Sequence, residues 1–449
     1  MFRRLSIGSW KFFFSGNGTS LRTGRYLGRS VVLGLLVGVT TVLFRFLIDL
    51  GTRLIAVDEL AANRRWALFV VPALGAVAGH LILKRFKSAN HARGTDSAVH
   101  VFHHHDGDIP VAVIPVKSVA SVLTVASGGS AGYEGPVTLL GAACGSFLSK
   151  LLHLDGRARR VLVAAGLSAG IGSLFQAPLA GAIFGAEIFY SSSDLEYDAI
   201  LPGFVATAIS YTIFACFYGW APLFAMPPES FTNGIRLFPY IALALVVAIG
   251  ARFYISMFRG VEAFFARADL PGWLKVAVGG VLTGAIGFFL PDVLGPGYHM
   301  IQASVLTHNA QAVAAGLKDW PLHGFILFFV AKTLATSATV GSGGSGGVFA
   351  PALVCGGALG AATGIAFAHV LPASVGIHPA SFALVGMAGF VAAAVRVPLA
   401  AIVMVAELCG NHELLLPTMW VVGIAFWLNN GWSLYRSQPH NRASAPISL

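Results

Sequence analysis

One stretch of this sequence occurs twice, and both copies interrupt an apolar segment. The first copy is Lys117–Pro136, KSVASVLTVASGGSAGYEGP, and the second is Lys332–Pro351, KTLATSATVGSGGSGGVFAP. Aligned positions are all 215 residues apart, and the Lys, Thr-Val, Ser-Gly-Gly-Ser and Pro residues are identical in the two copies. A chance match would not preserve so many residue types at one separation, so the chain contains two related halves.

In each copy the apolar segment ends in Gly and Ser, and a Pro then opens a new apolar segment. Pro suits the first turn of a helix, and Gly lets the backbone come close to a ligand. The free N–H groups and the positive dipole end of a helix N-terminus bind anions. Breaks at matching places in the two halves of a membrane protein point to a central binding site.

The composition is that of an integral, multi-pass membrane protein. The 449 residues are 56% hydrophobic and 11% charged, whereas soluble domains carry about 25% charged residues. The net charge of +10 lies largely in short basic segments beside apolar spans, which is typical of topology signals in a lipid bilayer and not of a nucleic-acid partner. The cysteines are scattered through apolar segments, which favours neither disulfides nor zinc; they are Cys144, Cys216, Cys355 and Cys409.

A second repeated stretch supports the division into halves. Ala177–Glu187 matches Val397–Glu407 at a separation of 220 positions. We expect halves at about 30–220 and 235–430 within a membrane domain of residues 30–438, after a cytoplasmic segment 1–29. Several apolar spans are shorter than the roughly 20 residues that cross a bilayer, which predicts partial or re-entrant helices.

Glu134 is the leading candidate for a functional side chain, because Phe349 takes its place in the second copy. A carboxylate in the first turn of a helix often only compensates the dipole. An ionisable residue between apolar segments is costly, however, and is functional by default. Ionised Glu134 would compete with a mobile anion for the same N–H groups, and its protonation would free them. We therefore predict that Glu134 is both gate and proton carrier.

Lys117 and Lys332 occupy matching places in the two apolar segments. Either they extend to the membrane interface, or they provide a positive field that favours an anion; both alternatives stay open. His103, His104 and His105 are expected in a polar loop between helices, within the stretch 84–108. A metal site there is disfavoured because adjacent side chains point in different directions. No HExxH motif and no phosphate-binding GKS or GKT motif is present, so we expect neither an enzyme nor a cofactor.

The motifs of the repeated stretches resemble those of a known family. Gly132–Pro136, GYEGP, is similar to the GxEGP motif of the CLC chloride channels and proton-coupled chloride transporters, and Gly347–Pro351, GVFAP, matches the family's GxFxP motif. Gln176–Gly181, QAPLAG, resembles its NAPLAG stretch. The resemblance implies an all-α CLC-type membrane fold with two inverted repeats of tilted, partial helices. It also implies a homodimer with one anion pathway per subunit.

The resemblance also implies site residues. The N–H groups of Val348 and Phe349 would contact chloride, and Glu134 would be the external gate. The Tyr435 hydroxyl would face the central anion, which suits a hydroxyl donor. The glycines of the two motifs would let the backbone approach the anion; these are Gly132, Gly135 and Gly347.

The sequence departs from the family pattern in three places. The family's GSGIP motif is absent. Residues Ala92–Asp96 occupy its position, and Arg93 or Thr95 would replace the anion ligand that the motif supplies. Ile188, which carries no proton, replaces a second, inner glutamate. The chain ends soon after Tyr435, so we expect a short cytoplasmic tail 439–449 without a regulatory domain pair, as in a prokaryotic inner-membrane protein.

The predicted function is chloride conduction with pH-dependent gating by Glu134, either channel-like or loosely coupled to protons. One alternative is a chloride/proton antiporter with a different inner proton path, and another is a fluoride-preferring relative. A cation-coupled solute transporter would share the broken helices. Its site would require carbonyl and carboxylate oxygens, however, where these breaks supply N–H groups.

Overall fold

The computed structural model describes residues 19–86, 94–224, 234–306, 320–372 and 375–446. Within these ranges the regular secondary structure is helical, apart from one isolated antiparallel bridge between Gly132 and Gly347. Seven described helices are long and apolar enough to cross a membrane, and shorter apolar helices lie among them. The expected all-α, multi-pass membrane architecture, with partial helices, is therefore confirmed.

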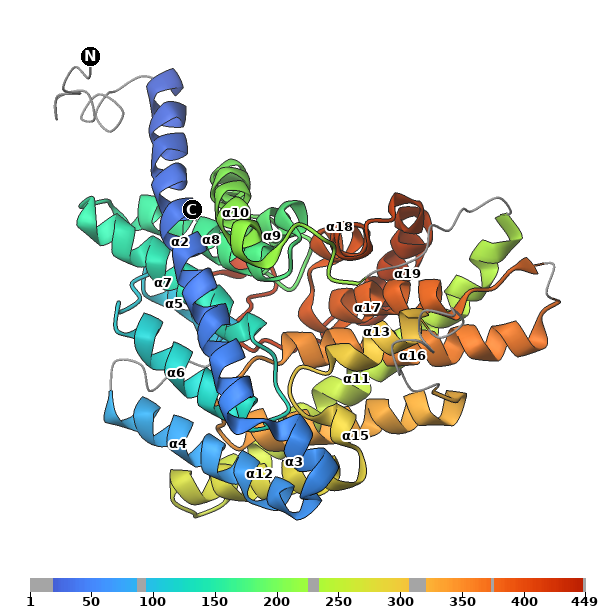
Figure 1. The fold of residues 1–449 in the computed structure, drawn as a ribbon. Helices are drawn as coiled ribbons and strands as arrows, with labels where there is room; N and C mark the ends of the chain where they lie inside the picture. The colour runs from blue at the N-terminus through green and yellow to red at the C-terminus, as the bar shows by residue number, and fades with distance from the viewer. Residues whose placement is uncertain (1–18, 87–93, 225–233, 307–319, 373–374, 447–449) are drawn as a thin grey trace.

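The two halves lie largely side by side, blue to green in the first and yellow-green to red in the second (Figure 1). The α-helices of the first half are α2 (Thr19–Ile55), α3 (Val57–Asn63), α4 (Val71–Arg85), α5 (Thr95–His104), α6 (Val113–Ala126), α7 (Glu134–Leu151), α8 (Gly156–Leu174), α9 (Pro178–Glu187) and α10 (Tyr197–Tyr218). Those of the second half are α11 (Phe238–Arg267), α12 (Gly272–Phe289), α13 (Tyr298–Leu306), α15 (Leu322–Gly341), α16 (Phe349–Val370), α17 (Pro379–Val395), α18 (Pro398–Cys409) and α19 (Leu415–Leu428).

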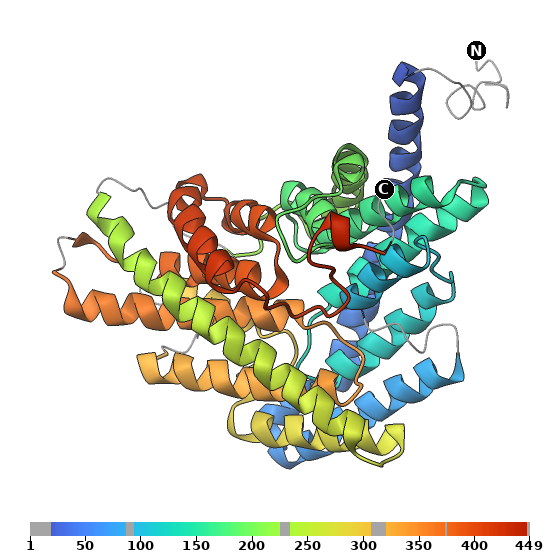
Figure 2. The same cartoon turned by 180° about the vertical axis from the view of Figure 1, so that it is seen from behind.

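The C-terminal segment returns from the second half to the first (Figure 2). The N–H groups of Ser191 and Ser192 donate to the carbonyls of Pro439 and His440 over 3.0 and 2.8 Å. The N–H of Ser437 donates to Asp96 over 2.9 Å. These bonds fix the segment that carries Tyr435 against the first half.

The polar stretch 84–108 is not only a loop, which corrects the prediction for this region. Thr95–His104 forms α5, whose buried face includes Val99, Phe102 and His103. The Phe102 ring stacks on Phe189 with centroids 3.8 Å apart. The helical spacing of Ala98, Val99 and Phe102 was masked by the charged and histidine residues around it.

Helices cross on glycines at matching positions of the two halves. A Cβ on Gly141 would lie 2.1 Å from the Gly166 carbonyl oxygen, where α7 crosses α8. A Cβ on Gly356 would lie 2.6 Å from the Gly386 carbonyl oxygen, where α16 crosses α17. Small residues are what allow helices to approach this closely in lipid.

Two glutamates tie the halves together by capping each other's helices. Both carboxylate oxygens of Glu187, at the end of α9, accept hydrogen bonds of 2.9 Å from the N–H groups of Leu399 and Ala400 on α18. Glu407, on α18, accepts bonds of 3.0 and 2.7 Å from Leu179 and Ala180 on α9. Each carboxylate thus satisfies the leading N–H groups of a helix that begins with Pro.

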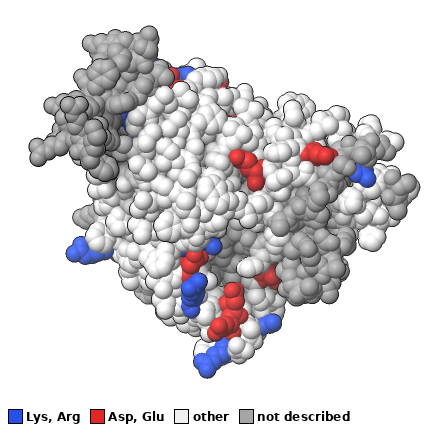
Figure 3. Space-filling view, turned by 45° about the horizontal axis from the view of Figure 1, so that its top comes forward, with Lys and Arg blue, Asp and Glu red and all other residues white. Residues whose placement is uncertain are grey.

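The outer surface is suited to lipid. Large apolar side chains of α2 are exposed along its length, including Leu35, Leu43 and Phe46. On the face drawn in Figure 3, uncharged surface dominates and charged side chains are sparse. Apolar exposure on this scale is unusual for a soluble monomer and ordinary for a membrane-facing surface.

We expect Gly141→Ala to destabilise the protein by about 1–3 kcal/mol, because the new methyl group overpacks the crossing with α8. Thermal unfolding in detergent, followed by tryptophan fluorescence, measures the effect. Gly423→Ala is the matched control, since nothing lies within 4 Å of a Cβ at this position of α19. Equal unfolding temperatures for the two variants would contradict the glycine crossing.

We expect Glu187→Ala to destabilise the protein by about 1–3 kcal/mol, because two N–H groups of α18 lose their acceptors. The exposed Glu59, which forms part of the first turn of α3, provides the control Glu59→Ala. The same unfolding measurement applies. A loss for Glu187→Ala no larger than for the control would show that the reciprocal capping contributes little.

Candidate anion-binding site

The two repeated loops meet through their backbones at Gly132 and Gly347. The N–H of Gly132 donates to the Gly347 carbonyl over 2.8 Å, and the N–H of Gly347 donates to the Gly132 carbonyl over 2.8 Å. A Cβ on Gly135 would lie 2.7 Å from the Gly347 Cα. The structure therefore brings together the three predicted glycines, where a larger residue would force the loops apart.

Hydroxyl groups of the repeats reinforce this contact in pairs. The N–H of Ser130 donates to Thr339 Oγ1 over 3.1 Å, and the N–H of Ser345 donates to Thr124 Oγ1 over 3.3 Å. The Ser130 hydroxyl also lies 3.0 Å from that of Thr336, and the Ser345 hydroxyl lies 3.0 Å from that of Ser121. These Ser and Thr residues thus hold the two loops together.

The helices that start at these loops have no side-chain cap from their own N-cap residues. α7 begins at Glu134 and α16 begins at Phe349, and neither N-cap residue, Tyr133 or Val348, forms a side-chain cap. By contrast, the carboxylates of Glu407 and Glu187 cap α9 and α18. Uncapped N–H groups at two adjoining helix ends provide partners for an anion.

Neighbouring contacts fix the peptide between Val348 and Phe349. The Tyr254 hydroxyl donates to the Val348 carbonyl over 3.0 Å. Because C=O and N–H point in opposite directions in a trans peptide, this bond directs the Phe349 N–H away from Tyr254. The Phe349 ring packs edge-on against Phe175 and Phe184, each with centroids 5.5 Å apart. The ring is therefore part of the apolar core.

The Glu134 carboxylate lies between the two helix N-termini. The residue is 1% exposed, and its Oε1 accepts a hydrogen bond from the Tyr298 hydroxyl. The N–H groups of Glu134 and Ala350 are nearby, although Oε2 has no hydrogen-bond partner among the described residues. A Cβ on Gly132 would lie 2.0 Å from Oε2. The carboxylate is thus folded back over Gly132, where a free anion would meet the same N–H groups.

Tyr435 and Thr95 approach this loop from the other side. Tyr435 is buried and its hydroxyl faces Thr95. Thr95 Oγ1 lies 2.7 Å from Thr138 Oγ1, which donates to the Gly135 carbonyl over 2.8 Å. The structure therefore links both predicted residues to the segment that carries Glu134. Arg93, the other predicted substitute, lies outside the described residues.

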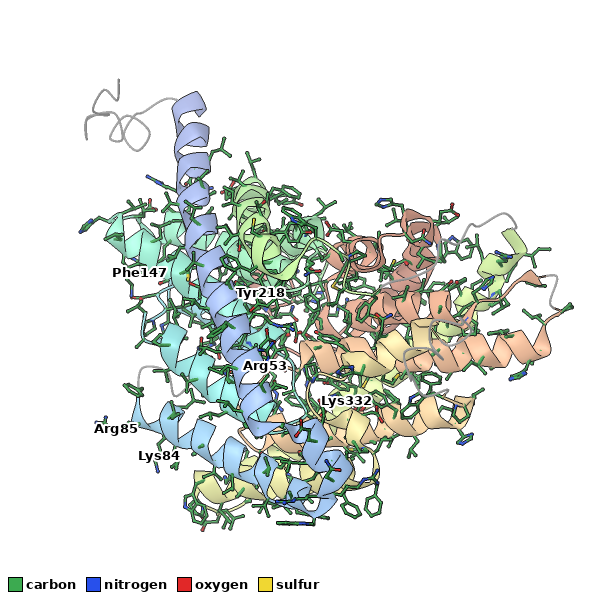
Figure 4. The ribbon with its side chains drawn as sticks, viewed as in Figure 1. Arg53, Lys84, Arg85, Phe147, Tyr218 and Lys332 are labelled. Atoms are coloured by element: carbon green, nitrogen blue, oxygen red, sulfur yellow. The ribbon has the colours of Figure 1, made fainter. Side chains whose placement is uncertain are left out.

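Both candidate lysines are buried within the protein. Lys332 is 0% exposed, and its ammonium group donates to the carbonyls of Val293 and Gly295 over 2.8 and 2.6 Å. Figure 4 shows it in the interior, whereas Lys84 and Arg85 lie at the outer end of α4. Lys117 on α6 is also buried. Extension to the membrane interface therefore does not describe Lys332; its contribution to a positive field stays a prediction.

In the described part of the chain, no group of three His, Cys, Asp or Glu residues is placed to hold a metal ion. His103 is buried, and its Nε2 lies 2.9 Å from the Phe189 carbonyl. His104 and His105 are exposed. His103 thus packs in the core, His104 is the last residue of α5 and His105 is its C-cap residue.

The sequence analysis missed two ionisable residues, Tyr298 beside Glu134 and the buried Glu196. Tyr298 follows Gly295-Pro-Gly297, which had no counterpart among the repeated motifs. Glu196 is fully buried in the segment after Ile188, itself a core residue. The Tyr190 hydroxyl donates to Glu196 Oε1, and Arg442 lies 3.9 Å from Oε2. An isolated glutamate in SSSDLEYD was the available sequence signal for this second carboxylate.

Known proteins resemble this chain along most of its length. The family model described as voltage gated chloride channel matches residues 74–430. A ClcB-like chloride channel protein of Ralstonia nicotianae is 32% identical over 79% of this chain and 80% of its own length. The H(+)/Cl(-) exchange transporter ClcA of Yersinia pestis is 30% identical over 86% of this chain and 81% of its own length.

Solved structures support the same fold. A CLC-type fluoride/proton antiporter superposes with a TM-score of 0.79 at 20% identity, covering 94% of this chain and all of the other. A slow cyanobacterial Cl-/H+ antiporter has a TM-score of 0.78 at 24% identity, covering 92% of this chain and 96% of the other. From the motifs, the fold and the matching family model, this chain belongs to the CLC family of membrane anion channels and transporters.

Proposed function

We propose that this protein conducts chloride through a site at the N-termini of α7 and α16, and that Glu134 is a pH-dependent gate. The observation that carries the proposal is the position of the Glu134 carboxylate, folded over Gly132 beside the N–H groups of Glu134 and Ala350. The ionised carboxylate occupies the place of a mobile anion. Protonation removes its charge, and with it the competition for the N–H groups.

Further contacts support chloride as the mobile anion. The N–H of Phe349 belongs to a peptide that Tyr254 orients, and an uncapped helix start attracts negative charge. Tyr435 would offer its hydroxyl to the anion on the other side of the Glu134 loop. All of these groups come from one chain. The homodimer expected from the resemblance would therefore contain two separate pathways, and the bacterial relatives support placement in a bacterial inner membrane.

The coupling to protons distinguishes the main proposal from its alternative. Ile188 lies in the apolar core and carries no proton, which favours channel-like or loosely coupled conduction. The alternative is chloride/proton antiport, as named for the Yersinia pestis relative. Glu196 favours this alternative, because it is a buried carboxylate in the same segment, bonded to Tyr190 and close to Arg442.

We expect chloride efflux from liposomes to rise as the pH falls, and Glu134→Gln to abolish this dependence. A single titrating group changes its protonated fraction by at most about tenfold per pH unit. In Glu134→Gln, flux should stay near the level that the wild type reaches at low pH. Efflux is recorded with a chloride electrode between about pH 4 and pH 8, and a parallel series with fluoride tests the fluoride-preferring alternative.

The exposed Glu59 again provides a control, as Glu59→Gln, which should keep the wild-type pH profile. Unchanged pH dependence in Glu134→Gln would remove Glu134 from the gate. Absence of chloride flux from folded wild-type protein would reject chloride conduction altogether.

We expect chloride to move down its gradient without driving protons uphill when the membrane potential is clamped with a potassium ionophore. Internal pH and chloride are recorded together in the same liposomes. Uphill proton movement would reject the channel-like proposal and select antiport. In that case Glu196→Gln should reduce the ratio of protons to chloride while chloride flux continues, and an unchanged ratio would exclude Glu196 from the proton path.

A further inference from the structure

Tyr298, the first residue of α13, is in direct contact with the proposed gate. Its hydroxyl donates a hydrogen bond to Oε1 of Glu134. Its ring is partly buried against the core and lies edge-on to Phe224, with centroids 6.1 Å apart. A movement that carries the Glu134 carboxylate away from Tyr298 breaks this hydrogen bond.

The loop that presents Tyr298 is held by a buried charge. The Lys332 ammonium group donates to the carbonyls of Val293 and Gly295, just before α13. Gly297 has a φ of 88°, and a Cβ there would lie 3.2 Å from Lys332 Cε. A fully buried ammonium that lost these carbonyls would be strongly destabilised, so the loop is fixed in place. The Tyr298 hydroxyl is therefore presented to Glu134 by a rigid support.

The two oxygens of the Glu134 carboxylate differ in their hydrogen bonds. Oε1 has the phenol as donor, whereas Oε2 has no hydrogen-bond partner in the described ranges. A hydrogen bond to an ionised acceptor is stronger than one between neutral groups. Tyr298 is consequently a side-chain donor to the ionised carboxylate, beside the backbone N–H groups of Glu134 and Ala350.

The other charged or titratable groups around Glu134 come from several elements and act on it electrostatically. They are Arg45 on α2, Tyr133 immediately before α7, Lys332 on α15 and Tyr435 in the C-terminal segment. None of these groups is altered by removing the Tyr298 hydroxyl. A change in pH response after that removal therefore reports on the Tyr298–Glu134 hydrogen bond.

We infer that Tyr298 is a positioning residue that latches the ionised Glu134 carboxylate in the anion site and sets how readily chloride displaces it. The inference rests on the proposed function, because it assigns the contact that keeps the gate closed. It requires no proton on Tyr298 to move: the hydroxyl keeps its proton and loses only its acceptor when Glu134 leaves.

The test is Tyr298→Phe, which removes the hydroxyl and keeps the ring that packs on Phe224. We expect chloride flux at neutral pH to rise about tenfold, the ratio that corresponds to a typical charge-assisted hydrogen bond. The midpoint of the pH–flux curve should move to higher pH by about one unit, because the lost bond stabilised the ionised carboxylate. A merely structural role for Tyr298 would lower flux without moving this midpoint.

Two comparisons isolate the contact. Tyr211→Phe removes the hydroxyl of a half-buried tyrosine on α10 whose ring contacts Trp220, and it should leave the midpoint unchanged. Tyr298→Phe should have no further effect in a Glu134→Ala background, because the latch acts only through Glu134. An unshifted midpoint in Tyr298→Phe, or an effect of equal size in the Glu134→Ala background, would overturn the inference.

Chloride binding provides a readout that does not depend on transport. Isothermal titration with chloride near neutral pH should show about tenfold tighter binding to Tyr298→Phe than to the wild type, because chloride displaces a less firmly held carboxylate. If Tyr298→Phe does not fold, Tyr298→Leu should give the same shift in midpoint, and an unshifted midpoint rejects the latch.

The outcomes separate this inference from the function on which it rests. Wild-type flux that depends on pH through Glu134, together with an unshifted Tyr298→Phe midpoint, rejects the latch alone. Wild-type flux without pH dependence rejects both the Glu134 gate and the latch.

Discussion

The two backbone hydrogen bonds between Gly132 and Gly347 are the contact on which the rest of the site depends. They bring the two loops to a separation at which a Cβ on Gly347 would lie 2.6 Å from the Gly135 nitrogen. Because α7 and α16 begin two residues after Gly132 and Gly347, the same bonds bring the first N–H groups of both helices into one region. The position of the candidate anion site thus follows from backbone contact, which side-chain hydrogen bonds reinforce.

Function lies where the two halves differ. Both halves use the same hydroxyl pairs, the same glycine crossings and the same reciprocal glutamate caps. At the start of α7 and α16 this correspondence ends. Glu134 places a carboxylate in the proposed anion site, whereas the ring of Phe349 joins Phe175 and Phe184 in the apolar core. The proposed gate is therefore the one part of this contact region in which the two halves carry different chemistry.

The repeat, its glycines and Glu134 as a candidate residue could be recognised in the sequence. A loop that accepts only Gly is visible in the local sequence, and so is a charged residue within an apolar segment. The partners of these residues could not. Tyr298 meets Glu134 across 164 positions, and the carbonyls that bind Lys332 lie in a loop whose path only tertiary packing determines. The α5 helix was missed for a different reason, since its short buried face is hidden among polar residues.

The contacts between the halves have the form of an isologous interface, in which residue i meets j while the counterpart of i meets the counterpart of j. The pair Gly132 and Gly347 follows this rule, and so do Glu187 and Glu407, each of which caps the helix that contains the other. The two halves thus meet as two subunits of a symmetric dimer would, but within one chain. A single chain can carry a glutamate in one half and a phenylalanine at the matching position of the other, which identical subunits cannot do.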